Sequence, residues 1–426
     1  MKRLFIIEDN VANNISYYLL AAFLIGLPFD RFYSEWLLIV FCLHTLIHFK
    51  VESLIRLKNK KVWIAGSVFI VSILCVTYSL HPHEGFKDAL DQIAILLFPI
   101  FLSITNLDLQ KYKYRLLEIF GLTWVVTVVY LFFKAFEVIW HFHLPIAALL
   151  KTPFLNQNFT APIELHATYF SMYVLLSMCI FLFLFYLTPS KKNRKYIFYS
   201  LILLAGLLQL ASRSTIIAAF LLIVFIIPLF LFHRKKRTIF FITSLLLSAL
   251  IIFSILNVDS LRKRYVSDLE NDLSEKFRDP GDLTESRMSR WKVEWQLIEK
   301  SPLLGYGTGS EKFVLNEKYF ENKFYRSYLL SLNSHNQFLS CWLTAGLAGL
   351  LIYLYVFYFS LKISIKRKDF LLLSLISLLF IVSFSENILD VSKGLLFYGF
   401  FLSFLLLHGP ENALISGTNS NEATAL

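Results

Sequence analysis

Apolar runs of membrane-spanning length recur along the whole chain and constrain its fold more than any other feature. A helix rises about 1.5 Å per residue, so about 20 apolar residues cross a hydrocarbon core about 30 Å thick. Twelve runs approach this length, at residues 14–30, 34–49, 62–80, 88–104, 115–136, 162–187, 195–211, 214–232, 238–257, 335–361, 369–385 and 391–408. With 57% hydrophobic and 17% charged residues, the chain is too apolar for a soluble protein. We therefore expect an all-α, polytopic integral membrane protein with about twelve transmembrane helices.

Lys and Arg residues are distributed unequally between the loops on the two sides of this predicted bundle. The chain carries a formal net charge of +11, and cytoplasmic loops of membrane proteins collect Lys and Arg. With the N-terminus inside, the short inside segments hold 22 Lys and Arg residues and the short outside segments hold 6. This bias supports the count of spans, because one missing span would invert every later loop. It predicts that both termini are cytoplasmic and that residues 258–334 lie outside.

These predicted spans divide the chain into four parts. Residues 1–257 are predicted to form nine transmembrane helices, and residues 258–334 one large loop outside the membrane. Residues 335–408 supply three more helices. Residues 409–426 are polar, rich in small side chains and free of Lys and Arg, which predicts a disordered cytoplasmic tail.

Three basic residues on the outside face are candidates for a functional site. Arg213 lies between two spans that almost touch, where a cation needs an anion, carbonyl groups or water; an interfacial Arg that snorkels to lipid headgroups is an equal alternative. Arg287 opens a predicted helix, and Arg290, one turn on, competes with it. His335 begins a span with Ser334 as the expected N-cap, so the helix dipole would favour the neutral imidazole that a general base requires. The alternative for His335 is an interfacial residue that merely caps the helix.

Other residues at the same face are weaker candidates. Glu386 and Asp390 could orient a base or hold an acceptor sugar, and Asn336 follows the histidine directly. Gly346 and Gly349 form a Gly-x-x-Gly pattern that permits close packing of membrane helices.

Metal, cofactor and nucleotide motifs are weak or missing in the sequence. The His81–His83 and His141–His143 pairs supply too few zinc ligands, and the acidic run at 268–272 has Leu273 where a calcium loop needs Gly. The sequence has no Walker A loop, no GxGxxG motif after a strand and no haem or flavin signature. We expect no metal, no cofactor and no nucleic-acid partner.

The order of the motifs in the distal half resembles the O-antigen ligase and polymerase superfamily. The resemblance rests on three motifs. The first is Arg213 in Leu-Ala-Ser-Arg-Ser-Thr, and the second is Arg287-x-x-x-Trp291, followed by Pro-Leu-Leu-Gly-Tyr-Gly at 302–307. The third is His335-Asn336, which nine residues separate from Gly346. These proteins are glycosyltransferases of the bacterial inner membrane with about twelve spans and one large periplasmic loop. The motifs cover about residues 195–410.

The resemblance implies a reaction as well as a fold. An undecaprenyl-diphosphate-linked glycan would be the donor, and lipid A–core oligosaccharide or another glycan the acceptor, among membrane lipids at the periplasmic face. Arg213 and Arg287 would bind the diphosphate, and His335 would deprotonate or orient the acceptor hydroxyl. Asn336, Arg290, Glu386 and Asp390 would be supporting residues. The transfer would invert the anomeric carbon without a metal.

Two other functions are compatible with such a chain. A polymerase that joins lipid-linked repeat units would use similar residues, although the spacing from His335-Asn336 to Gly346-x-x-Gly349 favours the ligase. A polysaccharide exporter without chemistry should carry charged residues within several spans and repeat symmetry, whereas the ionisable residues here concentrate on the outside face.

Overall fold

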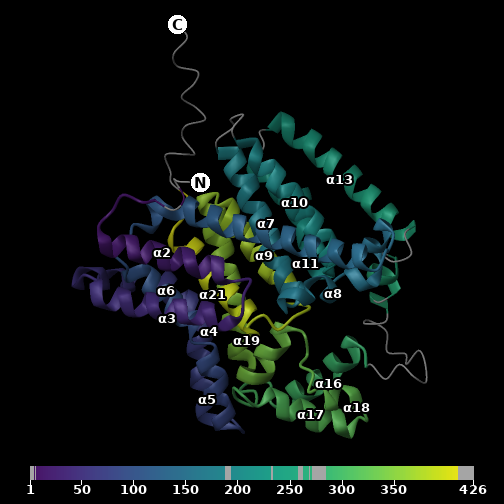
Figure 1. Cartoon of the computed structure of the whole chain (residues 1–426). Coiled ribbons are helices and arrows are strands. Elements are labelled where there is room, and N and C mark those ends of the chain that lie inside the picture. The colour runs from purple at the N-terminus through teal and green to yellow at the C-terminus, as the bar shows by residue number, and fades with distance from the viewer. Residues whose placement is uncertain are drawn as a thin grey trace.

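The computed structural model describes residues 4, 6–187, 193–231, 234–257, 262–267, 269–270 and 285–410, and this part of the chain is helical without any strand (Figure 1). Its apolar helices are α2 (Val11–Gly26), α3 (Arg31–His48), α4 (Lys60–Cys75), α6 (Ala94–Ile104), α7 (Leu109–His141), α9 (Ala167–Leu187), α10 (Arg194–Leu210), α11 (Arg213–Leu221), α12 (Ile227–Leu231), α13 (Arg234–Asn257), α19 (Gln337–Arg367), α20 (Phe370–Val382) and α21 (Ser392–Leu407). A π-helical turn, Leu222–Ile226, joins α11 to α12. Every predicted span overlaps one of these helices or the continuous α11–α12 pair.

The number of helices long enough to cross a membrane is smaller than the number of apolar helices. By length and composition, five helices of the described residues can cross a membrane: Lys60–Tyr78, Leu109–His141, Ala167–Leu187, Arg213–Phe230 and Gln337–Arg367. A sixth results if α3 and the following 3-10 helix Val51–Lys58, which meet at 119°, form one broken span. Shorter apolar helices, among them α2, α20 and α21, accompany them. The protein is thus an all-helical membrane protein, and the count of twelve spans stays a prediction.

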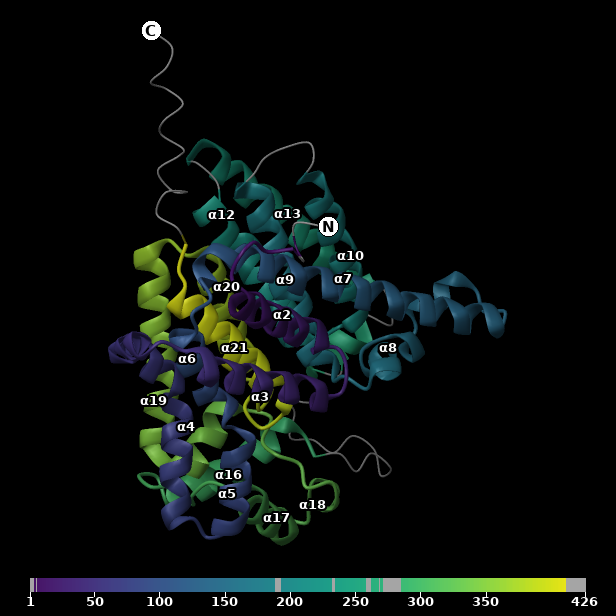
Figure 2. The same cartoon turned by 60° about the vertical axis from the view of Figure 1, so that its left-hand side comes forward.

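The predicted span at 88–104 is wrong as one continuous helix. The chain instead forms α5 (Pro82–Asp91), which carries Asp88 and Asp91, and then the separate apolar helix α6. Two carboxylates in one turn are costly in a hydrocarbon core, so the helix ends at Asp91 and only the apolar part enters the bundle. Figures 1 and 2 show α5 projecting from one end of the bundle, beside the helices of the 258–334 segment.

Three short helices build that end of the bundle, which we call the site end. They are α16 (Arg287–Lys300), α17 (Glu311–Glu321) and α18 (Tyr325–Leu329). The helix predicted over Arg287–Lys300 is confirmed. A separate small core of apolar side chains packs α16 and α17 against the first turns of α19, with Leu297, Leu315 and Leu343 among its buried members. Most of the acidic run at 268–272 and most of the tail lie outside the described residues.

The interior of the bundle is formed by helices that are apolar on all faces. Nearly every residue of α9 and α21 is buried, as expected for helices surrounded by others. Trp124 of α7 stacks on Tyr173 of α9 with ring centroids 4.4 Å apart. The Tyr173 hydroxyl donates to the backbone oxygen of Lys393 at 2.7 Å, which ties α9 to the start of α21.

A break in α19 receives a loop from the 258–334 segment. Ala345 and Gly346 leave helical geometry, with φ of 60° at Gly346. The carbonyl groups released by the break accept from the backbone amides of Tyr306 (2.9 Å) and Gly307 (2.8 Å), so the non-helical backbone is satisfied as an apolar environment demands.

The close approach at Gly346 is to this loop. A Cβ on Gly346 would lie 2.1 Å from the backbone oxygen of Leu303, and one on Gly349 would meet the oxygen of Cys341 in its own helix at 2.7 Å. The two glycines therefore make room for the break in α19 and the loop beside it, where the Gly-x-x-Gly pattern had suggested the packing of two spans.

Candidate functional site

His335 lies in an irregular stretch directly before α19. Asn336, and not Ser334, is the N-cap, since its side-chain oxygen accepts from two backbone amides of the first turn at 3.0 and 3.3 Å. The Ser334 hydroxyl instead donates to the backbone oxygen of Asn336 at 3.2 Å. His335 has a φ of 50°, a left-handed conformation. The expectation of an imidazole in the first helical turn is therefore wrong: the helix starts two residues after it.

One buried carboxylate, that of Glu386, joins His335 to Arg287. Nδ1 of His335 lies 3.2 Å from Glu386 Oε2, and Nη2 of Arg287 forms an ion pair with Oε1 at 3.9 Å. The hydroxyl of Thr168, at the start of α9, donates to the same Oε1 at 3.2 Å. Glu386 itself lies in the irregular stretch between α20 and α21, so four distant segments of the chain meet at one side chain.

The surroundings of Glu386 determine its charge and the tautomer of His335. Burial by itself raises the pKa of this carboxyl, but the hydrogen bond from His335 and the positive charge of Arg287 lower the pKa below its usual value. An ionised carboxylate can only accept hydrogen bonds, so Nδ1 of His335 carries the proton in this contact. Nε2 then bears the lone pair of the imidazole, which is the arrangement of a general base.

Side chains of helix α16 donate hydrogen bonds to the backbone near His335 and Glu386. Its first residue, Arg287, donates to the backbone oxygen of Ser385 at 3.0 Å. Arg290 and Trp291 donate to the backbone oxygens of residues 333 and 334 at 3.0 and 2.8 Å. Arg287 therefore lies at Glu386, whereas Arg290, the competing candidate, is buried against the segment that carries His335.

Arg213 belongs to a different helix from Arg287. It is the first residue of α11, two residues separate it from the end of α10 at Leu210, and the first of these, Ala211, has a φ of 46°. Helix α11 packs on α9 and α20. Thr168 is the second residue of α9, and the end of α20 leads into Ser385 and Glu386. The structure thus joins Arg287, His335 and Glu386 directly, whereas Arg213 lies on a helix that packs on α9 and α20.

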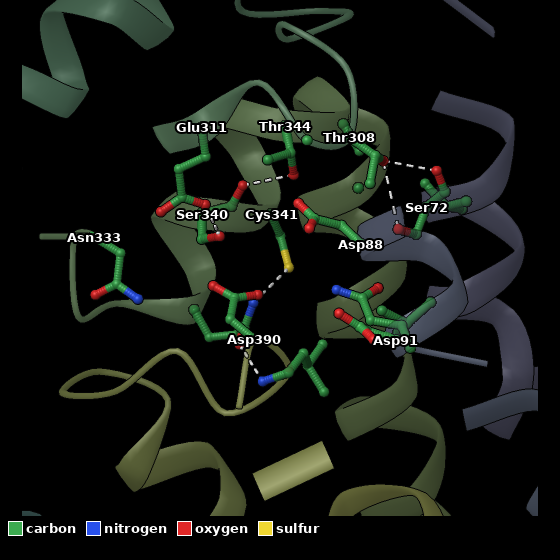
Figure 3. A pocket seen from close by; sticks show the side chains of 18 of the residues that line it. Ser72, Asp88, Asp91, Thr308, Glu311, Asn333, Ser340, Cys341, Thr344 and Asp390 are labelled. Atoms are coloured by element: carbon green, nitrogen blue, oxygen red, sulfur yellow. Dashed lines mark hydrogen bonds between the residues drawn. The ribbon is translucent and has the colours of Figure 1, made fainter. Parts of the chain in front are cut away.

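A pocket of about 290 Å³ lies next to this cluster (Figure 3). It opens between α4 and α5 on one side and α17 and α19 on the other. Asp88 and Asp91 approach from the α5 side, and Glu311 and Asp390 from the opposite side. Lys312 is the basic residue of its lining, and neutral polar groups complete it: Ser72, Gln92, Thr308, Ser331, Asn333, Gln337, Ser340 and Thr344.

Asn387 connects this pocket to the His335 segment. Its amide nitrogen donates to Asp390 Oδ2 at 2.7 Å and to Glu311 Oε1 at 3.3 Å. Its oxygen accepts from the backbone amide of Asn336 at 2.8 Å. Because Asn387 follows Glu386 directly, the stretch between α20 and α21 forms a wall of both the histidine cluster and the pocket.

Two carboxyl groups of the pocket, those of Glu311 and Asp390, resist ionisation. Desolvation by the surrounding protein raises the pKa of Glu311, and the charge of Asp390 raises it further. Desolvation also raises the pKa of Asp390, opposed by the hydrogen bond from Asn387 and supported by the charge of Asp88. The pocket can therefore both accept hydrogen bonds and, from a protonated carboxyl, donate them.

Several residues of the site were missed by sequence reasoning. Thr168, Glu311 and Asn387 belong to segments that no motif distinguished, and only folding brings them to Glu386 and Asp390. A signal was available for Asn387, because Glu386, Asn387 and Asp390 are clustered polar residues between two apolar runs.

Within the ranges that the structure describes, no group of three or more His, Cys, Asp or Glu side chains could hold a metal ion. His81 stacks on Phe313 with ring centroids 3.9 Å apart, and His141 ends α7. Independence of a metal stays a prediction.

The arrangement is that of a helical membrane protein in which a histidine and an arginine contact one buried carboxylate at one end of the bundle. Residues 198–354 match the family model described as O-antigen ligase, a range that includes Arg213, Arg287 and His335. This match confirms the resemblance to the O-antigen ligase and polymerase superfamily seen in the sequence, and it indicates a glycosyltransferase-like enzyme. A search of curated proteins gives no match.

Proposed function

We propose that the protein is an O-antigen ligase. It transfers O-antigen polysaccharide from undecaprenyl diphosphate to lipid A–core oligosaccharide at the periplasmic face of the bacterial inner membrane, with both termini in the cytoplasm. The observation that carries this proposal is the contact of one carboxylate, Glu386, with both His335 and Arg287, inside an O-antigen ligase-like chain.

His335 acts as the general base in this mechanism. The acceptor hydroxyl attacks the anomeric carbon, a new C–O bond forms, and the hydroxyl proton passes to Nε2 of His335. Glu386 is a positioning residue, because its bond to Nδ1 fixes the tautomer and orientation of the ring, as carboxylates do for catalytic histidines. It also stabilises the imidazolium that forms.

Arg213 and Arg287 bind the leaving group. As the bond from the anomeric carbon to the phosphate oxygen breaks, its electron pair stays on the lipid diphosphate, which gains negative charge. Guanidinium groups match phosphate oxygens in geometry and keep their charge, and such preorganised cations stabilise developing charge. Direct displacement inverts the anomeric carbon, and cleavage of the bond between the anomeric carbon and the phosphate oxygen supplies the driving energy, so neither a metal nor a cofactor takes part.

Reconstitution tests this proposal. Purified protein in lipid nanodiscs is given undecaprenyl-diphosphate glycan and lipid A–core, and the product is analysed by mass spectrometry. We expect His335→Ala to lower the rate by about 10²–10⁴-fold and Arg287→Ala by about 10²–10³-fold. His141→Ala, at the exposed end of α7, is the matched control and should keep full activity. Full transfer by His335→Ala would refute the assignment of the base.

A deletion strain separates ligase from polymerase. Loss of a ligase leaves lipopolysaccharide with the core alone while long lipid-linked chains accumulate. Accumulation of single lipid-linked repeat units would instead show the polymerase activity.

A further inference from the structure

The histidine cluster and the adjoining pocket differ in charge. Arg287 forms an ion pair with Glu386, whereas four carboxyl groups and one lysine line the pocket. At short range a diphosphate would be repelled by each of these carboxyl groups that is ionised. The pocket therefore suits a ligand portion that has hydrogen-bond donors and no negative charge.

Several carboxyl oxygens in the pocket are available to accept hydrogen bonds from a ligand. The carboxylates of Asp88 and Asp91 form no hydrogen bond or ion pair with other described residues, and both lie in the lining. Asp390 also contacts the pocket, and its Oδ2 accepts a hydrogen bond from Asn387. Asp88, Asp91 and Asp390 are exposed and line the pocket, so their carboxyl oxygens are available to accept hydrogen bonds from a ligand.

The size and the composition of the pocket fit part of a saccharide. Its volume of about 290 Å³ is at the lower limit for small-molecule sites. Carboxylates and amides accept from hydroxyl groups, and the amide groups of Gln92 and Asn333 together with the Ser340 hydroxyl can both donate and accept. The apolar side chains of Val68, Val71 and Ile352 also line the pocket.

The stereochemistry of the displacement indicates whether the donor or the acceptor saccharide would bind in the pocket. In an inverting displacement the nucleophile approaches from the side opposite to the leaving group. If the diphosphate lies at the arginines, the acceptor must approach from another side of His335. Asn387, which bonds Glu311, Asp390 and the backbone beside His335, makes the pocket continuous with that approach.

From this geometry we infer that the pocket lined by Asp88, Asp91, Glu311 and Asp390 is the acceptor subsite, which binds hydroxyl groups of the acceptor saccharide. The inference rests on the proposed function. It assigns donor and acceptor to neighbouring regions of opposite charge.

The double substitution Asp88→Asn and Asp91→Asn tests this inference. Both changes keep the size of the side chain and remove no hydrogen bond within the described residues, so the fold should persist, which thermal unfolding verifies. We expect roughly a tenfold rise in the KM for lipid A–core, as expected for weakened hydrogen bonds to charged groups, with an unchanged KM for the donor. Asp91→Asn alone should give a smaller rise. The control is Glu84→Gln, on the same helix but outside the lining.

A binding measurement separates the two proposals. Saturation-transfer NMR follows core oligosaccharide, released by mild acid from lipopolysaccharide without O-chains, on the detergent-purified protein. If the wild type transfers glycan and the double variant keeps its acceptor KM, or raises both KM values equally, the subsite is refuted and the ligase proposal stands. If the wild type transfers nothing but binds the oligosaccharide, and the double variant does not bind it, the subsite is supported and the ligase proposal falls. Absence of both transfer and binding refutes both.

Discussion

Glu386 and Asn387 are neighbours in the chain, but their side chains belong to regions of opposite character. Glu386 accepts from His335 and Thr168 and pairs with Arg287. Asn387 donates to Asp390 and Glu311 in the pocket. The first region collects positive charge around one carboxylate, and the second collects carboxylates around one amide.

This difference shows how a short irregular stretch can separate two chemical environments. The backbone between α20 and α21 consists of turns and bends, so two successive side chains contact two different sites without a helix between them. The positive region suits an anion, and the negative region suits hydroxyl groups. Substitutions of Glu386, Asn387 and their hydrogen-bond partners therefore test whether the two regions have separate roles.

The largest effect is expected for Glu386→Gln. A neutral amide cannot stabilise the imidazolium and no longer enforces the proton on Nδ1, which in a comparable triad costs several orders of magnitude. We expect kcat to fall by about 10²-fold or more, while the KM for the acceptor changes little. Steady-state kinetics with both substrates measures this, and Glu386→Asp should recover part of kcat. A kcat within twofold of the wild type would remove Glu386 from the mechanism.

An intermediate effect is expected for Asn387→Asp. The new carboxylate keeps the acceptor for the Asn336 amide, but it loses both donated hydrogen bonds and adds a like charge beside Glu311 and Asp390. The free energy of unfolding should fall by about 1–3 kcal/mol. Thermal unfolding in detergent should show a larger loss at pH 8 than at pH 5, because the like charges are then ionised. Asn322→Asp, at the end of α17, is the control, and equal losses at both pH values would contradict this account.

The smallest effect is expected for Glu311→Gln. The pKa of Glu311 is raised above its usual value of 4.5 in the fold, so its neutral form is the stabilising one. That stability is fully present below about pH 4.5 and is lost as the pH rises through the higher folded-state pKa. The variant does not ionise, and its Tm should gain a few degrees relative to the wild type between pH 5 and pH 9. A difference in Tm that is independent of pH would contradict the prediction.

The helical membrane architecture could be predicted because hydrophobicity and length act locally. Each apolar run became helix, and boundaries moved by a few residues except at 88–104, where Asp88 and Asp91 ended a helix that length alone had favoured. The start of α19 was misplaced because Ser334 and Asn336 can both cap a helix, and the choice depends on contacts with residues far away in the sequence.

The candidate site was predictable only in part. The motif order identified Arg213, Arg287 and His335, but it left the choice between Arg287 and Arg290 open. That choice follows from the orientation of α16, which turns Arg290 toward the backbone of residue 333 and Arg287 toward Glu386.

The sequence by itself determined that this chain is an apolar helical bundle and which three basic residues stand out, since hydropathy and motif spacing are properties of consecutive residues. Only the tertiary structure decided that Glu386 is the partner of His335, that Gly346 gives way to a loop, and that carboxylates from α5, α17 and residue 390 line one pocket. These contacts join residues tens to hundreds of positions apart, so they depend on how the helices pack.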